Sequence, residues 1–293
     1  MLTRPDWRTD GAGWPHREAS RFVDAGGIRW HVQVAGRGPA LLLLHGSGAS
    51  AHSWARLLPL LAPFFTVVAP DLPGHGFSES PAPERLDLPG VASLVGRLLR
   101  EMGIAPQLVA GHSAGAAVAA RMTLDGSIRP AGLVGLNPAL AAFDPPLGPL
   151  KPLLYALARS GPYAQLLAGL ATRRTVEATL ASTGSRLDAG LVDLYARLAA
   201  RPAHVNAVMT MMSRWDVAPL VADFPRLEPP FVLVFGGRDR WIDRAAVEEA
   251  ASRIPRRRAV TVPDTGHLTH EERPDAVATV ILELAREVGV IAG

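Results

Sequence analysis

A serine flanked by two glycines is the residue in this chain best suited to nucleophilic chemistry. Ser113 stands in a G-x-S-x-G pentapeptide between Gly111 and Gly115, with an apolar run at 108–110 before it and an alanine-rich run at 114–120 after it. This layout predicts a strand, a sharp turn and a helix, because glycines let the chain pass close to itself at such a turn. The turn would present the hydroxyl at the start of the helix, where backbone N–H groups favour developing negative charge.

A serine hydroxyl is a weak nucleophile at neutral pH, so the chain must also supply a base and an acid. His267, in the run D-T-G-H, is the candidate base, and Asp239, in the run G-G-R-D, is the candidate acid. We predict that His267 accepts the proton of Ser113 and later returns it to the leaving group. Asp239 would fix the imidazole tautomer and stabilise the imidazolium.

The negatively charged intermediate of such a reaction needs hydrogen-bond donors. The backbone N–H of Ala114, directly after the serine, is the first candidate. The second is expected from the loop His45-Gly46-Ser47-Gly48, most directly at Ser47. Losing one donor of this kind typically costs about 3 kcal/mol of transition-state stabilisation.

The elements around these residues alternate between strand and helix patterns, which predicts an α/β fold with a mostly parallel central sheet flanked by helices. Strands are expected at 22–23, 28–34, 41–44, 66–69, 107–110, 131–136, 231–235 and 259–262. Helices are expected at 53–61, 88–102, 114–124, 244–253 and 274–288. Ser113, Asp239 and His267 each follow a predicted strand. Because parallel strands end at one edge of a sheet, the three side chains should converge there.

The segment 139–226 interrupts the alternation with helical periodicity, many prolines and glycines, and few β-branched residues. We interpret it as a helical cap inserted over the sheet edge, which leaves 1–138 and 227–293 as the core. Leucines near helical spacing and the stretch 209–215 should seal the cap or line an apolar pocket; the leucines are Leu153, Leu154, Leu157, Leu166, Leu167 and Leu170. Candidate cations at its rim are Arg173, Arg174, Arg186 and Arg214. Residues 1–19 read as an extended arm anchored by two tryptophans.

Composition narrows the class of protein. The chain has 293 residues, 48% of them hydrophobic, and no cysteine, which excludes disulfides, thiolate metal sites and a cysteine nucleophile. The net charge of +3 is too diffuse to indicate nucleic acid as a partner. We find no signal peptide and no apolar run near the ~20 residues needed to cross a bilayer. We therefore expect no transmembrane segment and a cytoplasmic location, with contact at the periphery of the inner membrane left open.

Several polar residues near the candidate site have simpler interpretations. We expect His112 to pack rather than react, and His45 and His75 to hydrogen-bond backbone in their loops. Asp243 should cap the following helix, and Asp264 lies too near His267 in sequence to be the acid. His267 and His270 are three residues apart, but no further ligands cluster with them, so we predict no metal and no cofactor.

These residues resemble the α/β-hydrolase superfamily over nearly the whole chain. A closer resemblance is to the accessory hydrolases of magnesium chelatase in bacteriochlorophyll synthesis. It rests on segments 20–33, 71–78 (DLPGHGFS), 111–117, 183–188, 202–205 and 211–216. The resemblance implies a role around magnesium insertion into protoporphyrin IX, a small-molecule substrate such as a tetrapyrrole, and transient contact with the chelatase. Porphyrins of this pathway carry propionates and later a methyl ester, so the implied bond is an ester or similar acyl bond.

Two other functions stay open at this stage. One is a binding or chaperone module that holds porphyrin for the chelatase and uses its triad little. The other is a carbon–carbon bond hydrolase, because the loop 45–48 resembles the oxyanion loop of those enzymes. Haloalkane dehalogenases and epoxide hydrolases are disfavoured, since they place aspartate where Ser113 stands.

Overall fold

Eight strands form one sheet in the order β1-β2-β4-β3-β5-β6-β7-β8 in the computed structural model, which describes residues 2–141, 156–157 and 159–292. The strands are β1 (Ser20–Ala25), β2 (Ile28–Gly36), β3 (Ala40–Leu44), β4 (Thr66–Pro70), β5 (Leu108–His112), β6 (Gly132–Leu136), β7 (Phe231–Gly236) and β8 (Arg257–Val262). The pairs from β4 through β3 and on to β8 are parallel, whereas β1 and β2 pair antiparallel, as do β2 and β4. The mostly parallel α/β sheet expected from the sequence is confirmed.

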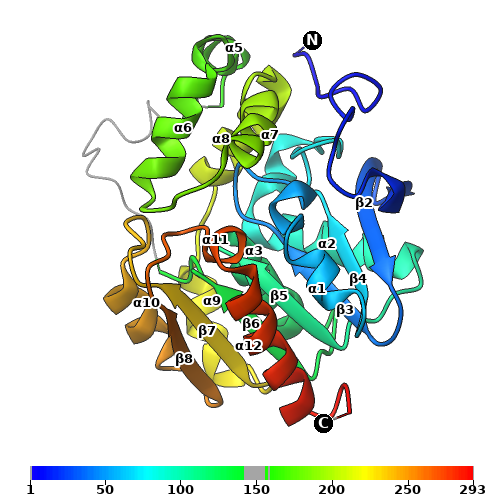
Figure 1. Cartoon of the computed structure of the whole chain (residues 1–293), viewed down its shortest axis with the longest axis vertical. Helices are drawn as coiled ribbons and strands as arrows, with labels where there is room; N and C mark the ends of the chain where they lie inside the picture. Colours follow the sequence, from blue (N-terminus) through cyan, green and yellow to red (C-terminus); the bar gives the residue numbers. More distant parts are fainter. Residues whose placement is uncertain (1, 142–155, 158, 293) are drawn as a thin grey trace.

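The central strands are apolar throughout because both faces of the sheet are covered. Successive side chains of β3 point to opposite faces: Leu42 and Leu44 enter one hydrophobic cluster, and Leu41 and Leu43 enter the other. The first cluster packs under α2 (Leu88–Glu101), α3 (Ala114–Leu124), α9 (Ala218–Asp223) and α10 (Arg244–Ala251), and the second under α1 (Leu58–Leu61) and α12 (Pro274–Glu287). The helices therefore form a layer on each side of the sheet (Figure 1).

One helix expected from the sequence is divided in two. The segment 53–61 forms a 3₁₀ helix, η2 (Ala51–Trp54), and then the four-residue α1. Pro59 explains the break, because it lacks the N–H that a continuous helix would bond to the Ala55 carbonyl. It is accommodated instead in the first turn of a new helix.

Four helices between β6 and β7 lie together at one end of the molecule, beyond the sheet edge (Figure 1). They are α5 (Gly161–Leu170), α6 (Arg173–Ser182), α7 (Ala189–Ala199) and α8 (Pro202–Ser213). The starts of the first three are set locally, since the side chains of Ser160, Thr172 and Asp188 each accept a hydrogen bond from a backbone N–H in the first turn of α5, α6 and α7. We call α5–α8 the cap helices.

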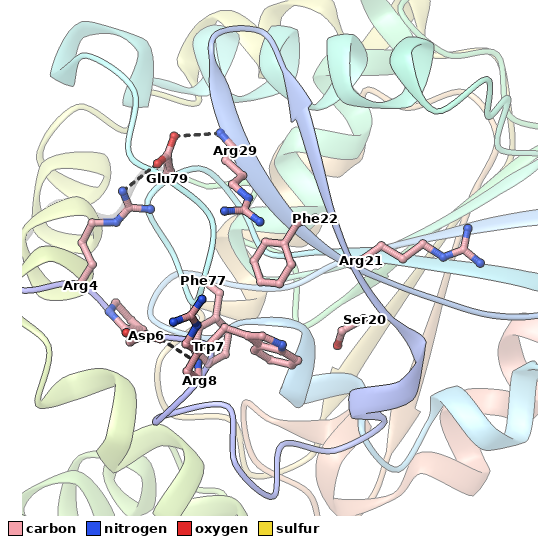
Figure 2. A pocket seen from close by; sticks show the side chains of 11 residues that line it. Arg4, Asp6, Trp7, Arg8, Ser20, Arg21, Phe22, Arg29, Phe77 and Glu79 are labelled. Atoms are coloured by element: carbon pink, nitrogen blue, oxygen red, sulfur yellow. Dashed lines mark hydrogen bonds and ion pairs between the residues drawn. The ribbon is translucent and has the colours of Figure 1, made fainter.

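The N-terminal arm is anchored by its tryptophans, as expected, but it is not extended, because residues 7–13 and 15–16 form turns and η1 (Arg17–Ala19) is a 3₁₀ helix. Trp14 is buried, and the Trp7 ring packs edge-on against Phe77 at 4.8 Å. The arm borders a groove of about 670 Å³, whose lining includes Trp7, Phe22 and Phe77 (Figure 2). Arg197 of α7 also donates a hydrogen bond to the carbonyl of Ala12, so the arm contacts the cap helices. Within the described part of the chain, no helix is long and apolar enough to cross a membrane.

Candidate active site

Ser113 occupies a strained turn between β5 and α3. Its backbone has φ 50° and ψ −115°, a conformation that costs a non-glycine residue about 1–3 kcal/mol. The flanking glycines are required by close packing, because a Cβ atom on Gly111 would overlap the Gly115 backbone and one on Gly115 would overlap the Leu44 carbonyl oxygen. The turn therefore holds the serine, which is half-buried, at the carboxyl end of the central strand and the start of α3.

Asp239 and His267 are hydrogen-bonded at the ends of the neighbouring strands β7 and β8. The His267 Nδ1–H donates to Asp239 Oδ2 at 2.9 Å. The same oxygen accepts from Asn137 Nδ2 at 2.8 Å, and Oδ1 accepts from the N–H groups of Trp241 (2.8 Å) and Ile242 (3.2 Å). Burial alone would raise the pKa of Asp239, but these donors, with His267 first, lower its pKa below the ordinary value. The carboxylate is thus ionised at neutral pH, and it leaves His267 Nε2 as the nitrogen available to a substrate or nucleophile.

His112 joins the serine turn to the loop that carries His267. Its ring lies 4.7 Å from the His267 ring, and its Nε2–H donates to the His267 carbonyl oxygen at 3.0 Å. Burial, reinforced by His270 and His267, lowers the pKa of His112 well below its ordinary value, so it stays neutral. His112 therefore packs, as the sequence suggested. Because it directly precedes Ser113 and contacts His267, it holds the two catalytic candidates near each other.

The loop 45–48 lies against the serine. A Cβ atom on Gly46 would come within 3.1 Å of the Ser113 Cβ. Among the described residues, the backbone N–H groups of Ser47 and Ala114 have no backbone acceptor, and the Ser47 hydroxyl is buried without a partner. Two donors are thus unengaged beside the serine, which is the arrangement that an oxyanion needs.

His45 holds this loop in place. Its Nδ1–H donates to the Gly46 carbonyl at 2.7 Å, and its Nε2 accepts the Leu72 N–H at 2.8 Å. Burial lowers the pKa of His45 to about 4, which keeps the neutral tautomer that both bonds require. His75 contacts the Pro73 carbonyl in the same way, at 3.1 Å. The scaffold role expected for both histidines is confirmed.

The rival acids lie elsewhere. Asp243 accepts a hydrogen bond from the Ala246 N–H and so caps α10, as expected. Asp264 sits in a turn with φ 58°. His270 Nε2 contacts Ser53 Oγ at 2.8 Å, and no cluster of three or more His, Cys, Asp or Glu residues in the described ranges could hold a metal ion.

The expectation for the cap leucines is wrong in part. Leu157, Leu166 and Leu170 are 46%, 58% and 59% exposed, so they neither seal the cap nor line a buried pocket. The reason is that α5 buries Ala164 and Ala168, its small-residue face, and leaves the leucines outside. Leu167 is half-buried, and Leu153 and Leu154 lie outside the described residues.

The arginines and methionines that were expected at the cap pocket lie partly at the surface and partly in the core. Arg173 is engaged on the surface by Asp193 and Glu177, which compete with any ligand. Arg174 and Arg186 are exposed, whereas Arg214 is half-buried. From the stretch 209–215, Met211 is buried in the core cluster and Met212 is exposed.

Asn137 is a site residue that the sequence interpretation missed. Its amide donates to Asp239 Oδ2 and to the Gly266 carbonyl, at 2.8 and 3.3 Å, and its own backbone is left-handed at φ 45°. It directly follows β6, between the strands of the serine and the acid. Its place at the carboxyl end of a predicted strand was a signal that could have identified it.

Comparisons with known proteins agree with the fold. A model of the alpha/beta hydrolase family matches residues 41–280. The chain is 36% identical to the magnesium-chelatase 30 kDa subunit of Rhodobacter capsulatus, over 95% of this chain and 98% of that protein. It is 28% identical to the pimeloyl-[acyl-carrier protein] methyl ester esterase of Xanthomonas axonopodis pv. citri, over 88% and 99%. A crystal structure of an alpha/beta hydrolase fold protein from Burkholderia ambifaria superposes with a TM-score of 0.77 at 26% identity, covering 90% of this chain and 97% of that one.

Proposed function

Because the chain belongs to the alpha/beta hydrolase family, we propose that it is a serine hydrolase that cleaves an ester or a similar acyl bond. The observation that carries the proposal is the hydrogen-bonded pair of His267 and Asp239, joined through His112 to the strained Ser113. A serine in such a turn, beside two unengaged N–H donors, suits acyl transfer.

The steps follow from the protonation states. Ser113 Oγ attacks the acyl carbon while its proton passes to His267 Nε2, and the N–H groups of Ser47 and Ala114 receive the negative oxygen. The bond to the leaving group breaks as His267 returns the proton to it. Water then attacks the acyl-serine while His267 takes its proton, and His267 returns that proton to Ser113 Oγ as the acid is released and the serine is restored. Asp239 stays ionised throughout and stabilises the imidazolium.

We further propose that the reaction serves the magnesium-insertion stage of bacteriochlorophyll synthesis, with a tetrapyrrole as substrate and transient contact with the chelatase. The support is the similarity to a magnesium-chelatase subunit over nearly the full length of both proteins. This role would place the protein in the cytoplasm, at or near the inner membrane. In the same proposal, residues 139–226 act as a cap over the serine, although α8 and α9 both contribute side chains to a core cluster of the sheet.

A fluorophosphonate probe tests the chemistry. Wild-type protein should be labelled at Ser113 and should hydrolyse a short p-nitrophenyl ester, and Ser113→Ala should abolish both. A matched control is Ser127→Ala, which removes a hydroxyl outside the site. Wild-type protein that is neither labelled nor active would refute the serine-hydrolase assignment.

The tetrapyrrole assignment needs a separate test, since the similarity to a chelatase subunit fits binding as well as catalysis. Protoporphyrin IX and its magnesium form can be titrated into wild type and Ser113→Ala, with the Soret band and tryptophan fluorescence as readouts. Conversion by wild type alone would support the enzyme. Saturable binding by both proteins without conversion would favour the binding module. Ester hydrolysis without porphyrin binding would leave a general esterase.

A further inference from the structure

A buried acid that the proposed mechanism does not use lies four residues after His267. Glu271, in α11 (Thr269–Glu272), is 1% exposed. Its Oε1 accepts a hydrogen bond from the Tyr195 hydroxyl at 2.6 Å and another from the Ser53 hydroxyl. Its Oε2 is buried and has no partner among the described residues. Burying a carboxyl group is costly unless its bonds compensate, so this one calls for an explanation.

The two hydroxyls that meet at Glu271 come from different parts of the molecule. Tyr195 belongs to the cap helix α7, and Ser53 belongs to η2 of the core, directly after the loop of Ser47. Glu271 itself is on the short helix that continues the His267 loop. One carboxyl oxygen therefore joins the cap, the oxyanion loop segment and the histidine loop.

A chain of contacts continues from this junction to the catalytic candidates. Ser53 Oγ accepts the His270 Nε2–H at 2.8 Å, and the His270 ring lies 4.5 Å from the His112 ring. His112 in turn packs on His267 at 4.7 Å. The cap meets the same loop at a second place, where Ser185 Oγ accepts the Leu268 N–H at 2.9 Å. A shift of α7 would thus be transmitted to the loop that positions His267.

Charge at the junction depends on Glu271. Burial raises its pKa to about 7, against the lowering effects of Ser53, Tyr195 and Arg56, while Glu272 raises it further. Burial also raises the pKa of Tyr195 well above its ordinary value, so the phenol remains a donor.

The other titratable groups that face the junction do not change charge near neutral pH. Burial lowers the pKa values of His52 and His270 to about 3, so both are neutral. The Arg56 guanidinium donates to the Glu271 carbonyl oxygen at 3.2 Å and is paired with Asp188. Glu271 is therefore the group of this cluster that changes charge near neutral pH.

We propose that Glu271 is a positioning residue, which holds cap helix α7 against the core beside the His267 loop through its bonds to Tyr195 and Ser53. The catalytic part of this inference rests on the proposed function. An ionised carboxylate is a stronger acceptor than a neutral acid, so the bonds from Tyr195 and Ser53 are individually strongest when Glu271 is ionised, while burial of that charge opposes its ionisation.

The first test measures the junction without using activity. Hydrogen–deuterium exchange of the 189–199 peptides should rise at least several-fold in Glu271→Gln and in Tyr195→Phe at pH 8. The matched controls Glu248→Gln and Tyr163→Phe, on surface helices away from the junction, should leave exchange unchanged. If Glu271→Gln does not fold, Tyr195→Phe, which removes one hydroxyl, supplies the same measurement. Unchanged exchange in α7 overturns the proposal whether or not the protein hydrolyses esters.

The second test separates positioning from a merely structural role. Losing a hydrogen bond to a charged group changes an equilibrium constant about tenfold or more. We therefore expect kcat/KM for a bulky ester that reaches the cap to fall by about that factor in Glu271→Gln. The change should appear mainly in KM, and p-nitrophenyl acetate should be hydrolysed within about twofold of wild type. The wild-type activity should also show a pH-dependent step near neutrality that Glu271→Gln lacks. Equal losses for both esters with an unchanged pH profile would overturn the positioning role, whereas inactivity of wild type would instead refute the hydrolase assignment.

Discussion

Replacing Asp239 by asparagine changes the hydrogen bonding of the site without changing its shape. Each carboxylate oxygen accepts two donors: Oδ2 from His267 and Asn137, and Oδ1 from the N–H groups of Trp241 and Ile242. An amide can offer only one oxygen, so its NH₂ group must face one of these pairs. The two backbone N–H groups cannot change their protonation, so the amide nitrogen should turn toward His267.

The size of the effect follows from the tautomer. With an amide N–H facing it, His267 Nδ1 must become an acceptor, and the proton moves to Nε2. That nitrogen can no longer take the proton of Ser113, which corresponds to a loss of about 10⁴ in kcat, or about 5.5 kcal/mol. The Asn137 amide also loses an acceptor in a buried place, so we expect the protein to be destabilised by about 1–3 kcal/mol.

The assay is hydrolysis of p-nitrophenyl acetate together with the rate of fluorophosphonate labelling, and a thermal melt shows that the variant is folded. Asp243→Asn and Asp264→Asn are matched controls. Asparagine caps helices as well as aspartate does and tolerates the left-handed backbone of position 264, so both variants should keep stability and activity. Asp239→Asn within tenfold of wild type, with either control inactive, would move the acid and refute the reasoning.

Three further predictions concern stability. Because burial raises the pKa of Glu271 from 4.5 to about 7, the folded protein holds a proton there that the unfolded chain releases. Unfolding free energy should therefore fall as pH rises through this window, by on the order of 3 kcal/mol, and Glu271→Gln should flatten the slope in denaturant titrations. Gly115→Ala should lower the unfolding free energy by ~3 kcal/mol and abolish probe labelling, since its Cβ meets the Leu44 backbone. The control Gly169→Ala, with open space around its Cβ, should not destabilise the protein. Equal melting temperatures of the two variants would contradict this prediction. Asp87→Ala should remove the cap of α2, lowering stability by about 1 kcal/mol at unchanged activity, and a loss of activity would show a role beyond capping.

The sheet and the place of the candidate site could be predicted because their signals are local. A parallel strand covered on both faces must be a continuous apolar run, and Leu41 to Leu44 is such a run wherever it stands in the chain. The serine turn needs glycines on both sides because the backbone passes itself there. Once the strands are parallel, the residues that follow them meet at one edge, so Asp239 and His267 could be paired from their order alone.

What only the tertiary structure decided depends on contacts between distant segments. The helical spacing of Leu166 and Leu170 predicted that they seal the cap or line a pocket. It could not show that α5 packs through its alanines and leaves these leucines exposed. Likewise, no local pattern brings the hydroxyls of Ser53 and Tyr195 to one oxygen of Glu271, since Tyr195 is 76 residues from Glu271 and 142 residues from Ser53. The pKa of a carboxyl depends on the burial and donors around it, which arise only when the cap and the core come together.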